Sequence, residues 1–253
     1  MGKVFCMMNQ KGGVGKTTTA VNLGVGLQNL GKKMLLIDLD PQANMTSSLG
    51  IPSRTLKYSI YDLLKGKAAL EEVVVDRNGL CLIPSSIALS GADIEFSSIP
   101  GRELLLKEAL SGVIENFDGI LIDCPPTLGL LVLNALTAAH EVIIPVQAEF
   151  LPLEGLSFLM ETVEVVRKRL NKNLEISGVV VTMYNSRQNL HKEAIDILQN
   201  HFGDKAFKTY IRSNISLAEA PGYGQDIFTY KPDSIGAVDY QRLCKEFIER
   251  EVL

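Results

Sequence analysis

Residues 10–18, with the sequence QKGGVGKTT, constrain this 253-residue chain more than any other segment. An apolar run at 4–8 precedes them and a helical pattern follows, which is the strand, glycine loop and helix order of a phosphate cradle. Glycines let backbone N–H groups converge on an anion at the start of the next helix, where the helix dipole also favours negative charge. The segment therefore predicts a site for a phosphorylated ligand.

The loop departs from the ordinary eight-residue pattern in one respect. That pattern has glycine five positions before Gly15, where this chain has Gln10, and an additional lysine, Lys11, stands directly before the glycine pair. Lys16 is expected to reach the β- and γ-phosphates and Thr17 to hold Mg²⁺. The candidate phosphate-binding residues are Lys11, Gly12, Gly13, Val14, Gly15, Lys16, Thr17 and Thr18.

Apolar runs alternate with helical patterns along the rest of the chain. Continuous apolar segments, typical of strands buried on both faces, lie at 33–38, 80–83, 119–122, 142–146 and 176–182. Helical patterns lie at 17–30, 102–117, 128–139, 155–170, 190–202 and 235–252. This order predicts an α/β fold, a doubly wound and mostly parallel sheet with helices on both faces and ligands at the carboxyl ends of the strands. Residues 41–100 are less regular and are expected to form loops and short helices on the nucleotide side.

Size and composition predict a single domain over residues 1–253, because 46% of the residues are hydrophobic and no linker is apparent. The net charge of −4 argues against a uniformly basic surface but permits a local basic face. Neither a signal peptide nor a membrane span is indicated, so a cytoplasmic location is expected. The four cysteines form no CxxC pair, which predicts neither zinc nor a disulfide framework.

Two of the apolar segments end in carboxylates. The sequence IDLDPQ at 37–42 carries Asp38 and Asp40, and ILIDCPP at 120–126 carries Asp123. Such acids alone are more often turn or cap residues. Beside a phosphate cradle, however, a carboxylate can orient or deprotonate the attacking water, and the second segment has the form of a Walker B strand whose acid binds Mg²⁺, in part through water.

The form KGGxGK[ST]T is the signature of the ParA/MinD/nitrogenase iron protein branch of P-loop proteins. Together with LDPQ at 39–42, DCPP at 123–126, LGLL at 128–131 and IPVQ at 144–147, it makes this chain resemble the short ParA/Soj chromosome-partitioning ATPases over nearly its whole length. The resemblance implies ATP and Mg²⁺ as cofactors, with Lys11, Lys16 and Asp40 as catalytic residues. It implies that Lys11 crosses a dimer interface to the partner's phosphates, that Asp40 positions the water, and that Thr17, Asp38 and Asp123 serve the metal.

A C-terminal segment and a group of basic residues extend the resemblance. Where the family usually has IPRNVRLSEAP, residues 211–221 match at Asn214, whereas Arg212 replaces the proline and Ser216 replaces an arginine. Arg212 and Asn214 are therefore predicted to bind ATP at its base and ribose, since a guanidinium can stack on adenine. Arg187 matches a DNA-binding arginine of the family, and Lys192 and Lys208 are predicted to join it.

The resemblance implies an ATP-bound homodimer, associated with the nucleoid, that binds nonspecific DNA. A ParB/Spo0J-like partner would stimulate its slow hydrolysis and so drive chromosome or plasmid segregation. Two alternatives stay open: a relative that positions another cargo, and a nucleotide-switched regulator of replication or transcription. The mixed charge of residues 244–253 argues against membrane binding, and the cysteine spacing argues against an iron–sulfur cluster.

Overall fold

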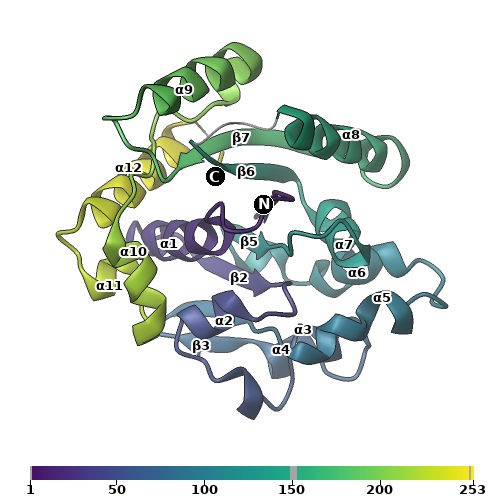
Figure 1. Cartoon of the computed structure of the whole chain (residues 1–253). Coiled ribbons are helices and arrows are strands. Elements are labelled where there is room, and N and C mark those ends of the chain that lie inside the picture. The colour runs from purple at the N-terminus through teal and green to yellow at the C-terminus, as the bar shows by residue number, and fades with distance from the viewer. Residues whose placement is uncertain (1, 149–152, 251) are drawn as a thin grey trace.

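One sheet organises the computed structural model, which describes residues 2–148, 153–250 and 252–253 (Figure 1). Within these residues the sheet has seven strands in the order β3-β4-β2-β5-β1-β6-β7. β3 pairs antiparallel with β4, and every other pair is parallel. The strands are β1 (Lys3–Met7), β2 (Met34–Asp38), β3 (Val75–Arg77), β4 (Leu80–Ile83), β5 (Gly119–Asp123), β6 (Glu141–Gln147) and β7 (Glu175–Thr182).

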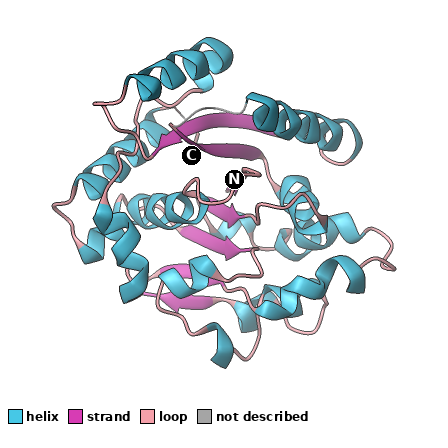
Figure 2. Cartoon of the chain, in the orientation of Figure 1, coloured by secondary structure: helices cyan, strands magenta, loops and turns pink. Residues whose placement is uncertain are grey.

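Helices cover both faces of this sheet, as Figure 2 shows. They are α1 (Lys16–Asn29), α2 (Asn44–Ser48), α3 (Ile60–Leu64), α4 (Leu70–Val73), α5 (Ala92–Glu95), α6 (Leu105–Leu110), α7 (Leu130–Ala138), α8 (Leu153–Arg169), α9 (Asn189–Phe202), α10 (Ile215–Glu219), α11 (Ile227–Tyr230) and α12 (Ile235–Glu249). The predicted doubly wound, mostly parallel α/β fold is confirmed.

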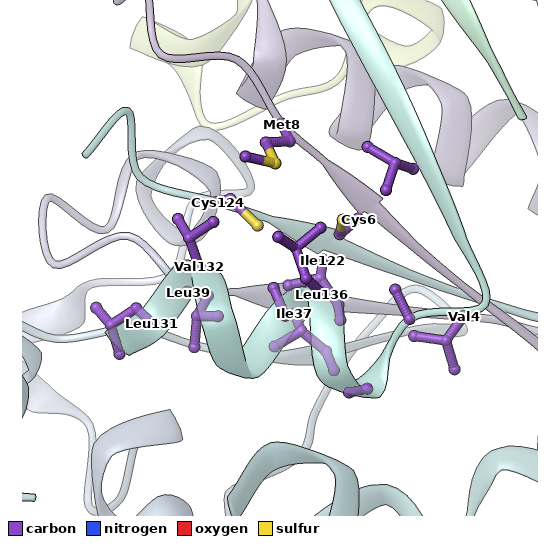
Figure 3. Packing of buried hydrophobic residues seen from close by; sticks show 14 of the residues in the cluster. Val4, Cys6, Met8, Ile37, Leu39, Ile122, Cys124, Leu131, Val132 and Leu136 are labelled. Carbon is purple, nitrogen blue, oxygen red and sulfur yellow. The ribbon is translucent and has the colours of Figure 1, made fainter. Parts of the chain in front are cut away.

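The strands are apolar throughout because successive side chains enter two different cores. In β1, Val4 and Cys6 belong to the cluster under α7 and α8, whereas Phe5 and Met7 belong to the cluster under α1 and α12. Figure 3 shows Leu136 of α7 on the side of the sheet toward which Cys6 points. This alternation follows from the two-residue period of a strand. Apolar burial on both faces holds the central strands, and hence their carboxyl ends, in fixed positions.

The single helix predicted over 102–117 is wrong. Short 3₁₀ turns at Arg102–Leu104 and Ile114–Asn116 flank a helix of only six residues, α6. Ser111 and Gly112 follow α6 directly, and both residue types favour turns over helix continuation. The prediction also omits β3, since a three-residue edge strand with two exposed positions has no apolar run to reveal it.

The segment 206–213 covers the open edge of β7. Phe207 N–H donates to the Val179 carbonyl at 2.9 Å, and Ile211 N–H donates to the Val181 carbonyl at 2.8 Å. The approach is close at Gly178, where a Cβ atom would lie 2.5 Å from the Phe207 ring. Covering an edge strand removes a site of nonspecific pairing. It also brings Arg212 and Asn214 to the carboxyl end of β7, beside the glycine loop.

Candidate nucleotide site

The glycine loop leaves the carboxyl end of β1, in the middle of the sheet, and leads into α1 (Figure 1). Gly13 and Gly15 have φ angles of 75° and 82°, a left-handed conformation that other residues adopt at a cost. Around Gly12 and Gly13, an added Cβ would meet nothing within 4 Å, so the space above the loop is open. The backbone thus has the form that the sequence predicts for a phosphate cradle.

Lys16 is folded over its own loop. Its side chain is 7% exposed, and Nζ donates to the Lys11 carbonyl at 3.4 Å. Burial lowers the pKa of Lys16 from its usual value, while the nearby Asp123 carboxylate opposes that shift. An arriving triphosphate would favour the charged ammonium, because a close negative charge stabilises a buried cation. The geometry places Lys16 where it can neutralise phosphate oxygens inside the cradle.

Thr17 and Asp123 meet across the end of β5. The Thr17 hydroxyl donates to Asp123 Oδ2 at 2.6 Å, while Asp123 Oδ1 is a buried oxygen with no hydrogen-bond partner among the described residues. Burial raises the pKa of Asp123 to about 8, and the carboxylate of Asp38 adds to the rise. A divalent cation would offset both effects, and Mg²⁺ prefers hard oxygen ligands. The Thr17 hydroxyl and the orphan Asp123 oxygen therefore fit a magnesium ion, which would bridge phosphate oxygens and neutralise their charge.

Asp38 is committed to organising the chain around it. Its Oδ2 accepts the Thr46 N–H at 2.8 Å and the Thr46 hydroxyl at 2.7 Å, and its Oδ1 accepts the Asp40 N–H at 3.2 Å. Burial raises the pKa of Asp38 to about 6, against these hydrogen bonds. In this state, the hydrogen bonds of Asp38 fix the turn from β2 into α2. Its predicted metal role stays a prediction.

Asp40 stands two residues beyond the end of β2, on the same edge of the sheet. It is 8% exposed, and its Oδ1 accepts the Gln42 N–H at 2.9 Å. Its charge reaches the cradle, since Asp40 acts on the pKa of both Lys16 and Asp123. Three neighbouring strands, β2, β5 and β1, thus bring the predicted acids and the predicted lysine together.

Lys11 differs from Lys16 in where its charge lies. Lys11 is exposed, and its Nζ donates to Gln147 Oε1, at the end of β6, at 3.3 Å. Asn9 orients this part of the loop, because its Oδ1 accepts the Lys11 N–H at 3.0 Å and its Nδ2 donates to the Pro145 carbonyl at 2.7 Å. The ammonium of Lys11 therefore lies outside the cradle of its own chain.

Two residues that support the loop were not predicted from the sequence. The first is Asn9. The second is Thr182, the last residue of β7, whose hydroxyl contacts the Val14 carbonyl at 2.8 Å and the Val146 carbonyl at 3.2 Å. A polar residue at the end of an apolar strand was the available signal, and here it joins the glycine loop to two further strands.

A cavity of about 210 Å³ adjoins the glycine loop on the side of β7. Gly15, Thr18 and Thr182 form part of its wall, and Arg212 and Asn214 form another part. Asn214 Oδ1 accepts the Ser216 N–H at 2.9 Å and so caps α10, which leaves its amide N–H groups for other partners. The structure therefore brings both predicted base-site residues to the P-loop.

The three basic residues predicted to bind DNA do not form one cluster. Arg187 is exposed in the loop that follows the carboxyl end of β7, and Lys192 is exposed in the first turn of α9. Lys208 instead lines a second cavity together with Glu141 and Glu175, the first residues of β6 and β7. Any basic surface around Arg187 and Lys192 thus excludes Lys208.

Known proteins share this geometry. A family model described as an AAA domain matches residues 2–176. Sporulation initiation inhibitor protein Soj of Bacillus subtilis is 48% identical over 97% of this chain and 98% of that protein. Chromosome-partitioning ATPase Soj of Treponema pallidum is 48% identical over 99% of both chains. The solved structure of cobyrinic acid a,c-diamide synthase from Mycobacterium smegmatis, with bound ADP and magnesium, has a TM-score of 0.88 at 33% identity, over 100% of this chain and 96% of that one.

The fold and the site define a P-loop ATPase that uses ATP and Mg²⁺. More narrowly, the chain belongs to the ParA/Soj family of chromosome-partitioning ATPases. The predictions of family, ATPase activity and cofactors are confirmed. The roles of individual residues, the dimer, the DNA and the stimulating partner stay predictions.

Replacing Lys16 tests the cradle. Lys16→Ala should weaken Mg-ATP binding by about 100-fold, because it removes a buried cation from the phosphates. Isothermal titration calorimetry measures the change, with Lys172→Ala, an exposed lysine beyond α8, as the control. Equal affinities for the two variants would remove Lys16 from the site.

Proposed function

We propose that this ATPase acts as an ATP-dependent homodimer that binds nonspecific DNA and is stimulated by a ParB/Spo0J-like partner during chromosome or plasmid segregation. The relatives named for chromosome partitioning support the biological role. Within the described residues, no helix is both long enough and apolar enough to cross a membrane. The adenine base of ATP would occupy the cavity next to Gly15, with the phosphates on the glycine loop.

The position of Lys11 carries this proposal. Lys16 already supplies the buried cation of the loop, so a second lysine has no role inside the same cradle. Lys11 is exposed and held at the rim by the weak contact to Gln147, from which a long flexible side chain is easily released. A second copy of the chain, placed face to face, would present Lys11 to the phosphates of its partner and neutralise charge as an arginine finger does.

Asp40 would complete the chemistry. A carboxylate at the end of β2 is suited to orient the water that attacks the γ-phosphate, because phosphoryl transfer depends on positioning and electrostatics. One oxygen of Asp40 is held by the Gln42 N–H, which fixes the carboxylate without consuming its second oxygen. Nucleotide binding and hydrolysis would then depend on different residues of the same edge.

Removing Lys11 separates binding from dimerisation. Lys11→Ala should keep the monomer's affinity for ATP but lose the ATP-dependent dimer, and partner-stimulated turnover should fall by about 10³-fold. Light scattering after gel filtration in Mg-ATP measures the dimer, and calorimetry measures the affinity. A Lys11→Ala protein that dimerises normally would contradict the role across the interface.

Removing Asp40 should have the opposite effect on the dimer. Asp40→Ala is expected to slow hydrolysis by about 100-fold or more, because the water loses its base, while leaving the phosphates bound. The ATP dimer should therefore accumulate in the same gel-filtration experiment. Hydrolysis at the wild-type rate would show that another group positions the water.

DNA binding requires its own test. In a gel-shift titration, the wild-type protein with ATP should bind DNA of unrelated sequences alike, and affinity should fall as salt increases. Arg187→Ala and Lys192→Ala should each reduce the slope of log affinity against log salt by about 1, as expected for one lost phosphate contact. Lys208→Ala, at the other end of β7, is the matched control. Absence of ATP-dependent binding at low salt would overturn the proposed DNA partner.

A further inference from the structure

One wall of the cavity beside the glycine loop is held in place by a residue outside it. The Arg212 side chain donates from Nε to Asp239 Oδ2 at 2.9 Å and from Nη2 to Asp239 Oδ1, and its backbone N–H donates to Oδ2 at 3.0 Å. Asp239 lies on α12 and does not line the cavity. Backbone and side chain of Arg212 are thus tied to one carboxylate.

The two partners differ sharply in exposure. The Asp239 side chain is 2% exposed, whereas the Arg212 side chain is 40% exposed. A carboxylate buried to this degree is strongly destabilising unless it is paired and fully hydrogen-bonded. Within the described residues, all four hydrogen bonds to the Asp239 carboxylate come from Arg212. The guanidinium is therefore fixed along its Nε and Nη2 edge, while Nη1 makes no bond to Asp239.

The cavity gives this fixed guanidinium a specific neighbour. Its other lining side chains are apolar, small or uncharged, so Arg212 is the one charged group among the described residues that line it. A planar guanidinium held in one orientation can stack on an aromatic ring. A free arginine at the same place would instead turn toward the triphosphate on the adjoining glycine loop, where the attraction between opposite charges is greater.

We propose that Asp239 is a positioning residue for the nucleotide base, because it holds Arg212 as a wall of the cavity and keeps its charge away from the phosphates. The inference rests on the proposed placement of the base in this cavity. Asp239 itself touches no ligand. The pair therefore raises the affinity of the site for a base-bearing nucleotide over that for its phosphate chain alone.

Two ligands separate these contributions. Mg-ATP carries the base, and magnesium tripolyphosphate carries only the phosphate chain. Asp239→Asn keeps the side-chain shape but removes the charge that orients Arg212, so ATP affinity should fall roughly 10-fold, as a lost stacked cation would predict. Tripolyphosphate affinity should stay the same or increase, because Arg212 becomes free to reach phosphates. Calorimetric titration of the full-length chain measures both.

Glu246 provides a matched control on the same helix. It accepts the Lys208 N–H at 2.7 Å and the Thr209 N–H at 2.8 Å, and it pairs with Arg250 at 2.6 Å. Glu246→Gln therefore loosens the same segment from α12 without touching the cavity. It should leave the ratio of ATP affinity to tripolyphosphate affinity at the wild-type value.

A double variant keeps the test valid if Asp239→Asn unfolds. Arg212→Met with Asp239→Leu removes both charges, so no carboxylate is left buried without a partner, and a urea midpoint checks folding. This protein should show the same roughly 10-fold loss of ATP affinity. Equal losses for both ligands in Asp239→Asn, or wild-type ATP affinity in the folded double variant, would overturn the positioning role. Absence of ATP binding by the wild-type protein would overturn the nucleotide site itself, and this inference with it.

Discussion

Buried charge at the carboxyl ends of three adjacent strands is the constraint on which the site depends. Lys16, Asp38 and Asp123 are each less than a tenth exposed, and all lie at one edge of the sheet. Desolvation lowers the pKa of the lysine and raises those of both acids. Such a group of charges is stable only when each is paired or hydrogen-bonded. Thr46 and Thr17 provide hydrogen bonds to the two acids, and the orphan oxygen of Asp123 leaves a place that a cation fits.

The two cores explain why the strands can hold these charges. Side chains alternate between the cluster under α7 and the cluster under α1, so each central strand is fixed from both faces. Because the backbone at the strand ends cannot relax freely, the acids keep their separation. Rigid positioning of this kind is what phosphoryl transfer asks of a protein.

Much of this arrangement could be predicted from the sequence, because its signals are local. The glycine loop, the acids at strand ends and the buried runs each occupy a few consecutive residues. The break in the helix predicted over 102–117 was hidden, since a short amphipathic pattern continues across Ser111 and Gly112. The contacts of Thr182 with the Val14 carbonyl and of Arg212 with Asp239 join residues far apart in sequence. No spacing in a single chain reveals such pairs.

The segment that covers β7 also joins the base cavity to the loop that carries Arg187. Tyr184 N–H donates to the Ile211 carbonyl at 2.9 Å, and Ser213 N–H donates to the Tyr184 carbonyl at 3.0 Å. Met183, which lines the cavity, has a φ angle of 53°, a strained value for a side chain of its size. Since the same backbone forms the cavity wall and begins this loop, the position of one constrains the other. Strain at Met183 can persist only because these hydrogen bonds hold both neighbours in place.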